Sequence, residues 1–140
     1  MAGRTELAGS DGTLAAWFIA QYAIGEPDFQ RYALTLIHDK VQRGEVPPAQ
    51  EAFLLDRIAM YEGRAQRYGT QSLPCPDGEY RRWRTEDPEH LNERRAAIGL
   101  PPVEDDPLET EPTPQARAEY ETWLRRYEEW LQRSGWRKPV

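Results

Sequence analysis

Apolar residues recur at three- and four-residue spacing in five stretches of the chain, and this pattern predicts five helices. The stretches cover about 14–22, 27–43, 48–65, 88–98 and 113–136. Prolines near their starts and glycines after several of their ends are typical helix boundaries. No segment alternates apolar and polar residues over a length sufficient for a strand. We therefore expect an all-α fold, with small orthogonal or bundle-like packing of four core helices plus a C-terminal amphipathic helix.

Two stretches lack this periodicity. Residues 68–83 contain Gly69, Pro74, Pro76 and Gly78 among aromatic side chains, which indicates an ordered loop. Residues 101–112 hold four prolines and five acidic residues, which favour an extended, solvated linker. The predicted organisation is a helical domain over 1–104, an acidic proline-rich linker over 105–112, and an aromatic helix over 113–140 packed on the domain.

Composition narrows the possible partners and compartment. The chain has 140 residues, about one domain, with 18 Lys and Arg against 24 Asp and Glu and a net charge of −6. This charge disfavours nucleic acid as a partner. The single cysteine, Cys75, cannot form an intramolecular disulfide, and no secretory or membrane-spanning pattern is present. We expect a cytoplasmic protein without a membrane partner.

The most informative polar residues lie between positions 56 and 71. Asp56 and Arg57 interrupt an apolar helical pattern, and Gln66 would project near Asp56 if that helix continued. The polar residues that follow are Tyr68, Thr70 and Gln71. Such a group can orient a polar ligand in an apolar pocket. The alternative is a buried Asp–Arg pair with capping hydrogen bonds that only fasten a loop.

Several spaced motifs point to a family. They read Ala-Trp-Phe-Ile-Ala-Gln over 16–21, Asp-Arg-Ile over 56–58, Gln-Arg-Tyr-Gly-Thr-Gln over 66–71, and Glu-Arg-Arg-Ala-Ala-Ile-Gly-Leu over 93–100. In this order they resemble a bacterial family of uncharacterised domains, over about residues 11–104. Members of that family usually have His after the glutamine that matches Gln21, where this chain has Tyr22. The resemblance implies no established activity, and if that histidine is a base in relatives, this chain has lost the reaction or uses Tyr22 or Asp56.

These residues suggest a cofactor-independent enzyme or binder that acts on a mid-sized metabolite by acid–base chemistry. Cyclisation, dehydration, isomerisation and hydrolysis all fit such a set. In this hypothesis Asp56 is the general base, Tyr68 or Tyr22 is the proton donor, Gln21, Gln66 or Gln71 polarises a carbonyl, and Trp17, Arg57 and Thr70 contact the substrate. The alternative is a non-catalytic interaction or regulatory module whose C-terminal aromatic helix docks on another chain or on its own copy as a homodimer.

Other chemistry has less support in the sequence. His38 and His90 are the only histidines, too few for a usual metal site, and no nucleotide-binding fingerprint is present. We expect no metal and no cofactor. Residues 79–84 form a basic aromatic patch. We interpret its arginines as partners of acidic residues or of an anionic ligand group.

Overall fold

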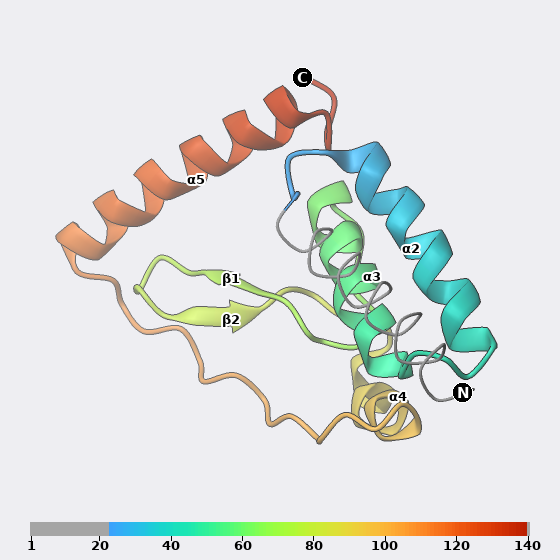
Figure 1. Cartoon of the computed structure of the whole chain (residues 1–140). Helices are drawn as coiled ribbons and strands as arrows, with labels where there is room; N and C mark the ends of the chain where they lie inside the picture. Colours follow the sequence, from blue (N-terminus) through green and yellow to red (C-terminus); the bar gives the residue numbers. More distant parts are fainter. Residues whose placement is uncertain (1–22, 140) are drawn as a thin grey trace, which may run out of the picture.

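The computed structural model describes residues 23–139, and the helix expected over 14–22 lies outside them. Figure 1 shows two long helices side by side, a small hairpin, a short helix, and a C-terminal helix that points away from the others. The elements are α2 (Pro27–Gln42), α3 (Pro48–Glu62), β1 (Ser72–Pro74), β2 (Tyr80–Arg82), the 3-10 helix η1 (Pro88–His90), α4 (Leu91–Ala97) and α5 (Pro114–Ser134).

The all-α prediction is wrong, because the segment expected to be a loop contains an antiparallel hairpin. β1 pairs with β2 in the register Ser72 to Arg82. At the turn between the strands, Cys75 N donates to Glu79 O, and Gly78 has a φ of 91°. Each strand is only three residues long. That length is too short to produce a recognisable alternation of polarity.

The described residues also do not show the expected four core helices followed by a fifth. Three α-helices precede α5 in this part of the chain, and one of them, α4, has only seven residues. The third predicted helix ends earlier than expected, since α3 stops at Glu62 and Gly63 caps it with a φ of 82°. Glycine reaches this left-handed conformation without steric cost. Gln66 therefore lies in a loop, and the expected helical alignment of Asp56 with Gln66 does not exist.

The core forms where α2 and α3 meet the C-terminal end of the chain. Ile37, Leu54 and Tyr61 pack with Leu131 of α5 and with Trp136. The Trp136 ring lies 5.2 Å from that of Tyr61, and its Nε1 donates to Ile24 O at 2.7 Å. The end of the sequence thus closes the core beside the start of α2 (Figure 1).

The segment 98–113, called the strap here, runs from α4 past the hairpin to the start of α5 (Figure 1). Its residues lack regular structure over 100–113, and several hydrogen bonds hold it. Arg81 Nε donates to Pro107 O at 2.8 Å, and Thr110 N donates to Asp77 Oδ2 at 3.1 Å. None of the helices between residues 23 and 139 is long and apolar enough to cross a bilayer.

Candidate functional site

Asp56 is fully buried and accepts hydrogen bonds from the loop that follows α3. Its side chain has 0% exposure. Oδ1 accepts from Arg67 N at 2.8 Å and Tyr68 N at 3.1 Å, while Oδ2 accepts from Thr70 N at 3.1 Å and Thr70 Oγ1 at 2.9 Å. A buried carboxylate needs such partners. Asp56 therefore holds the loop 67–70 against α3.

Gln66 fastens the other side of the same loop. It is also 0% exposed, and its Nε2 donates to Gln71 O at 2.9 Å and to Trp83 O at 2.7 Å. Its Oε1 accepts from Gln71 N at 2.9 Å. Both ends of the amide thus bond to the Gln71 backbone and close the loop 66–71, and Nε2 also joins this loop to Trp83, the residue after β2.

Gly69 lies between these two anchors and has no room for a side chain. A Cβ at this position would lie 2.9 Å from Arg82 Cδ and 3.1 Å from Leu91 Cδ2, and the φ of 65° favours glycine. The Tyr68-Gly69-Thr70 turn is therefore closely packed on both sides.

The predicted polar residues converge, but mainly on one another. Asp56, Gln66, Thr70 and Gln71 form one network in which the buried oxygens and nitrogens are hydrogen-bonded. A buried, satisfied carboxylate does not suit the role of general base, because a ligand cannot reach it. Arg57 belongs to the same helix as Asp56, and burial lowers the pKa of its guanidinium. Trp17, Gln21 and Tyr22 lie outside the described residues.

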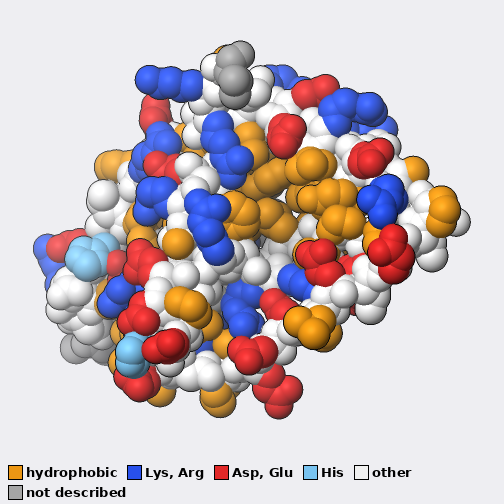
Figure 2. All heavy atoms as spheres, turned by 180° about the vertical axis from the view of Figure 1, so that it is seen from behind, with side chains coloured by type: hydrophobic (Ala, Val, Ile, Leu, Met, Phe, Trp, Pro, Cys, Tyr) orange, Lys and Arg blue, Asp and Glu red, His pale blue; other side chains and the backbone are white. Residues whose placement is uncertain are grey.

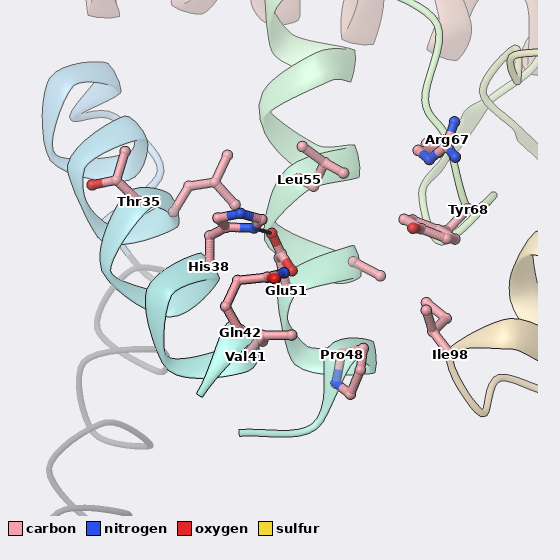
Figure 3. Close-up of a pocket in the computed structure, with 12 residues that line it drawn as sticks. Thr35, His38, Val41, Gln42, Pro48, Glu51, Leu55, Arg67, Tyr68 and Ile98 are labelled. Carbon is pink, nitrogen blue, oxygen red and sulfur yellow. Dashed lines mark hydrogen bonds and ion pairs between the residues drawn. The ribbon is translucent and has the colours of Figure 1, made fainter. Parts of the chain in front are cut away.

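Tyr68 is the predicted residue that does reach a groove. This groove has a volume of about 700 Å³, within the usual range for ligand sites. Apolar side chains form much of its wall, and the residues that line it come from α2, α3, the loop after α3 and the end of α4 (Figure 3). They are Leu34, Thr35, His38, Val41, Gln42, Pro48, Glu51, Ala52, Leu55, Arg67, Tyr68 and Ile98.

A histidine–carboxylate pair lies at one side of the groove. His38 Nδ1 lies 2.5 Å from Glu51 Oε1, a short contact that joins α2 to the first turn of α3 (Figure 3). The His38 side chain is 56% exposed and that of Glu51 is 18% exposed. With the proton assigned to Nδ1, the ring donates to Glu51 and keeps a free lone pair on Nε2. Within residues 23–139 Nε2 has no hydrogen-bond partner.

Tyr68 and Arg67 lie at the other side, across α3 in the view of Figure 3. The backbone of Tyr68 is held at both ends, since its N donates to Asp56 and its O accepts from Arg95 Nη1 at 2.7 Å. The Arg67 guanidinium lies 5.6 Å from the centre of the Tyr68 ring. Interaction with the Tyr68 side chain raises the pKa of Arg67, which stays positively charged. The buried network therefore positions a phenol and a cation at the groove.

Sequence reasoning missed the His38–Glu51 pair. The two residues are 13 positions apart on different helices, and only the packing of α2 on α3 brings them together. The sequence offers His38 only as one of two histidines, which are too few for a usual metal site. The described residues contain no group of three or more His, Cys, Asp or Glu side chains placed to hold a metal ion. The available signal was a histidine next to an apolar helix face, which does not identify its partner.

Comparison with known proteins assigns a family. The model of a family of unknown function, DUF6624, matches residues 3–110. Comparisons with curated proteins and with solved structures give no match. The match includes α2, α3, the hairpin and α4, and it ends before α5 begins at Pro114. Because it covers more than half of the sequence, the chain belongs to the DUF6624 family.

Proposed function

We propose that this protein is a cofactor-independent acid–base enzyme that binds a mid-sized metabolite in the groove, with His38 as the general base. The observation that carries the proposal is the contact between His38 Nδ1 and Glu51 Oε1 at the wall of a groove of about 700 Å³. A carboxylate on Nδ1 fixes the tautomer and stabilises the imidazolium after Nε2 takes a proton.

The rest of the groove supplies binding groups for a substrate. Leu34, Val41 and Leu55 offer apolar contacts, and Tyr68 offers a hydroxyl that can donate a hydrogen bond to a substrate oxygen. Arg67 adds a positive charge next to Tyr68. His38 lies across α3 from Tyr68 in Figure 3, so a substrate that contacts both must extend along the groove. This geometry favours a mid-sized molecule over a very small one.

The proposed reaction is proton transfer at a polarised substrate. His38 Nε2 removes a proton from a substrate carbon, a hydroxyl or a bound water, and the resulting imidazolium returns a proton to the product or leaving group. Isomerisation, dehydration, cyclisation and hydrolysis all contain this step. Asp56 has no part in the transfer, and its role is to position Tyr68.

The first test measures the tautomer of His38. The chain has only two histidines, so nitrogen-15 NMR resolves each imidazole once one is assigned with His90→Asn. The proposal expects the neutral His38 ring to carry its proton on Nδ1, and Glu51→Gln to weaken that preference. A neutral ring protonated on Nε2 would contradict the role of general base.

The second test is a screen of bacterial metabolites for compounds that raise the melting temperature and are then converted. A ligand of the native state stabilises it in proportion to occupancy. His38→Asn is expected to reduce conversion of any hit by 100-fold or more, and Glu51→Gln by about 10- to 100-fold. His90→Asn is the matched control, because His90 makes an exposed 2.8 Å contact with Asp87 and does not line the groove. Conversion that survives in His38→Asn would exclude this mechanism.

The alternative function is an interaction module that uses the aromatic stripe of α5, formed by Tyr120, Trp123, Tyr127 and Trp130, and it has a different expected outcome. Trp130 and Tyr127 pack against Tyr61 of the same chain, with ring centres 5.0 and 6.4 Å apart. These contacts occupy part of the stripe. If truncation after Leu108 abolishes association with a partner or a second copy, the interaction module is supported. If it only lowers the melting temperature, the helix is structural.

A further inference from the structure

We propose that a second cavity, between the hairpin and α5, binds a small molecule that combines a flat aromatic ring with an anionic group. The cavity has a volume of about 320 Å³. Figure 2 shows a hollow with hydrophobic side chains on its floor and basic and acidic side chains around it. The cavity shares no lining residue with the groove that contains His38, so this inference does not depend on the proposed function.

Three arginines line the cavity without a carboxylate partner among the described residues, two from the hairpin side and one from the segment after α5. Arg82 donates to Glu104 O, Arg84 to Gly63 O, and Arg137 to Tyr61 O and Met60 O. No ion pair involves any of these three guanidiniums among residues 23–139. By contrast, Arg81 is neutralised by Asp77 at 2.7 and 2.8 Å.

The residues that line the cavity carry a net positive charge. Glu128 is the one acidic residue among those that line it. These three guanidiniums, bonded only to backbone carbonyls, and the one carboxylate leave the lining with excess positive charge in a chain whose net charge is −6. Arginine binds carboxylate and phosphate oxygens with paired hydrogen bonds. This local excess favours an anionic ligand.

The α5 side of the cavity is a row of aromatic rings. Trp123 stacks on Tyr127 with centres 4.9 Å apart, and Tyr120 lies 5.9 Å from Trp123. On the hairpin side, the Arg84 guanidinium lies over the Trp83 ring, 4.6 Å from the ring centre. Aromatic edges and guanidiniums are both attracted to the electron-rich face of a ring. A flat aromatic ligand thus fits these walls better than an aliphatic one.

Tyr127 contributes its ring to the cavity wall. Its hydroxyl is buried and has no partner among the described residues. Burial raises the pKa of Tyr127 to about 12, so the hydroxyl keeps its proton at neutral pH. The hydroxyl is closed to solvent in this structure, so a ligand in the cavity contacts the Tyr127 ring and not its oxygen.

The cavity also depends on a part of the chain outside the family match. One wall comes from the hairpin, within residues 3–110, and the other comes from α5, which begins at Pro114. The site is therefore an addition to the matched domain, created when α5 is placed opposite the hairpin.

The test compares probes that differ in one property. Indole-3-acetate has the ring and the charge, indole-3-acetamide has the ring alone, and inorganic phosphate has the charge alone. Adenosine 5′-monophosphate distinguishes a phosphate-bearing ligand from a carboxylate-bearing one. Binding is followed by NMR through the indole N–H signals of the five tryptophans, assigned by substitution. The expected result is that at least one aromatic anion binds tenfold or more tightly than both indole-3-acetamide and phosphate, and shifts the Trp83 or Trp123 signal.

Matched variants test whether the ligand binds in this cavity. Arg84→Gln and Trp123→Leu are each expected to weaken the aromatic anion about tenfold or more. Arg126→Gln is the control, because Arg126 is exposed on the same helix and does not line the cavity, and its effect should stay below twofold. The backbone spectrum of each variant shows whether it is folded, and Arg82→Gln replaces any variant that is not.

A second readout uses the single cysteine. Cys75 lines the cavity, so a bound ligand should slow its reaction with a thiol reagent in the wild-type protein. Three results would overturn the proposal: no binding by either aromatic anion, affinity of both aromatic anions no higher than that of the acetamide, or binding that Arg84→Gln and Trp123→Leu leave unchanged. His38→Asn should leave this binding intact, which separates it from the proposed enzymatic function.

Discussion

The sequence suggests Asp56 as a general base, and the structure shows its carboxylate fully buried and hydrogen-bonded to the loop that follows α3. A carboxylate within an apolar helix pattern is costly to bury, so it must gain compensating hydrogen bonds or take part in the function. The sequence does not show whether the Asp56 carboxylate takes part in chemistry or accepts hydrogen bonds from a loop. The answer depends on where the backbone N–H groups of Arg67, Tyr68 and Thr70 lie, and α3 must end at Gly63 before the loop can turn back to provide them.

Asp56→Asn should therefore destabilise the protein strongly. The amide replaces one acceptor oxygen with a donor that faces the backbone N–H groups of the loop, and it removes the charge that strengthens the remaining bonds. We expect a loss of about 3 kcal/mol in the free energy of unfolding, which lowers the melting temperature by roughly 10 °C.

Thermal denaturation measures this loss, and Asp28→Asn is the control because Asp28 is fully exposed on α2. An Asp56→Asn protein that melts like the wild type, yet fails to convert a ligand of the groove, would return Asp56 to the role of catalytic base.

At the scale of elements, the helices were the predictable part and the hairpin was not. Proline at the start of α2 and α3 and glycine after α3 are local signals, and they place these helices within a few residues of the observed bounds. The hairpin depends on contacts that are distant in sequence. Its strands are held by Gln66 and by the strap, and no local pattern reveals these contacts.

Asp77 is the residue that joins the hairpin to the strap. It accepts two hydrogen bonds from Arg81 and one from Thr110 N, and Arg81 in turn holds the carbonyl oxygens of Pro107 and Leu108. The pKa of Asp77 lies well below its usual value, mainly because Arg81 donates hydrogen bonds to its carboxylate. A carboxyl group with a lowered folded-state pKa stabilises the native state above its unfolded pKa of about 3.9.

Asp77→Asn should consequently lower the melting temperature by several degrees at pH 7. The stabilisation by Asp77 is lost as the pH falls below about 4 towards the lowered folded-state pKa, so the difference between variant and wild type should shrink between pH 5 and pH 2. Melting curves across this range, with Asp39→Asn on the exposed side of α2 as the control, measure the trend. A difference that grows on acidification would contradict this linkage.

At the scale of the whole molecule, α5 extends beyond the matched family domain and yet completes its core. Leu131 is buried, and Trp136 after the helix is 4% exposed. Arg137 caps the end of α3 through Tyr61 O and Met60 O. The aromatic stripe was visible in the sequence, but its neighbours were not, because Tyr61 lies more than 60 positions earlier. Contacts between residues so far apart in the sequence form only in the folded chain, so a local sequence pattern does not identify them.

Trp136→Ala tests whether the chain end stabilises the whole molecule. Removal of a buried indole leaves a cavity beside Tyr61, frees Ile24 O from its 2.7 Å hydrogen bond, and removes the ring over which Arg31 lies at 5.3 Å. A loss of about 3–5 kcal/mol in the free energy of unfolding follows from burial alone. Trp123→Ala is the matched control, since Trp123 is only half-buried at the wall of the cavity, and it should cost less than half as much. Denaturant unfolding measures both values, and equal losses would mean that α5 contributes along its length instead of through the closure at Trp136.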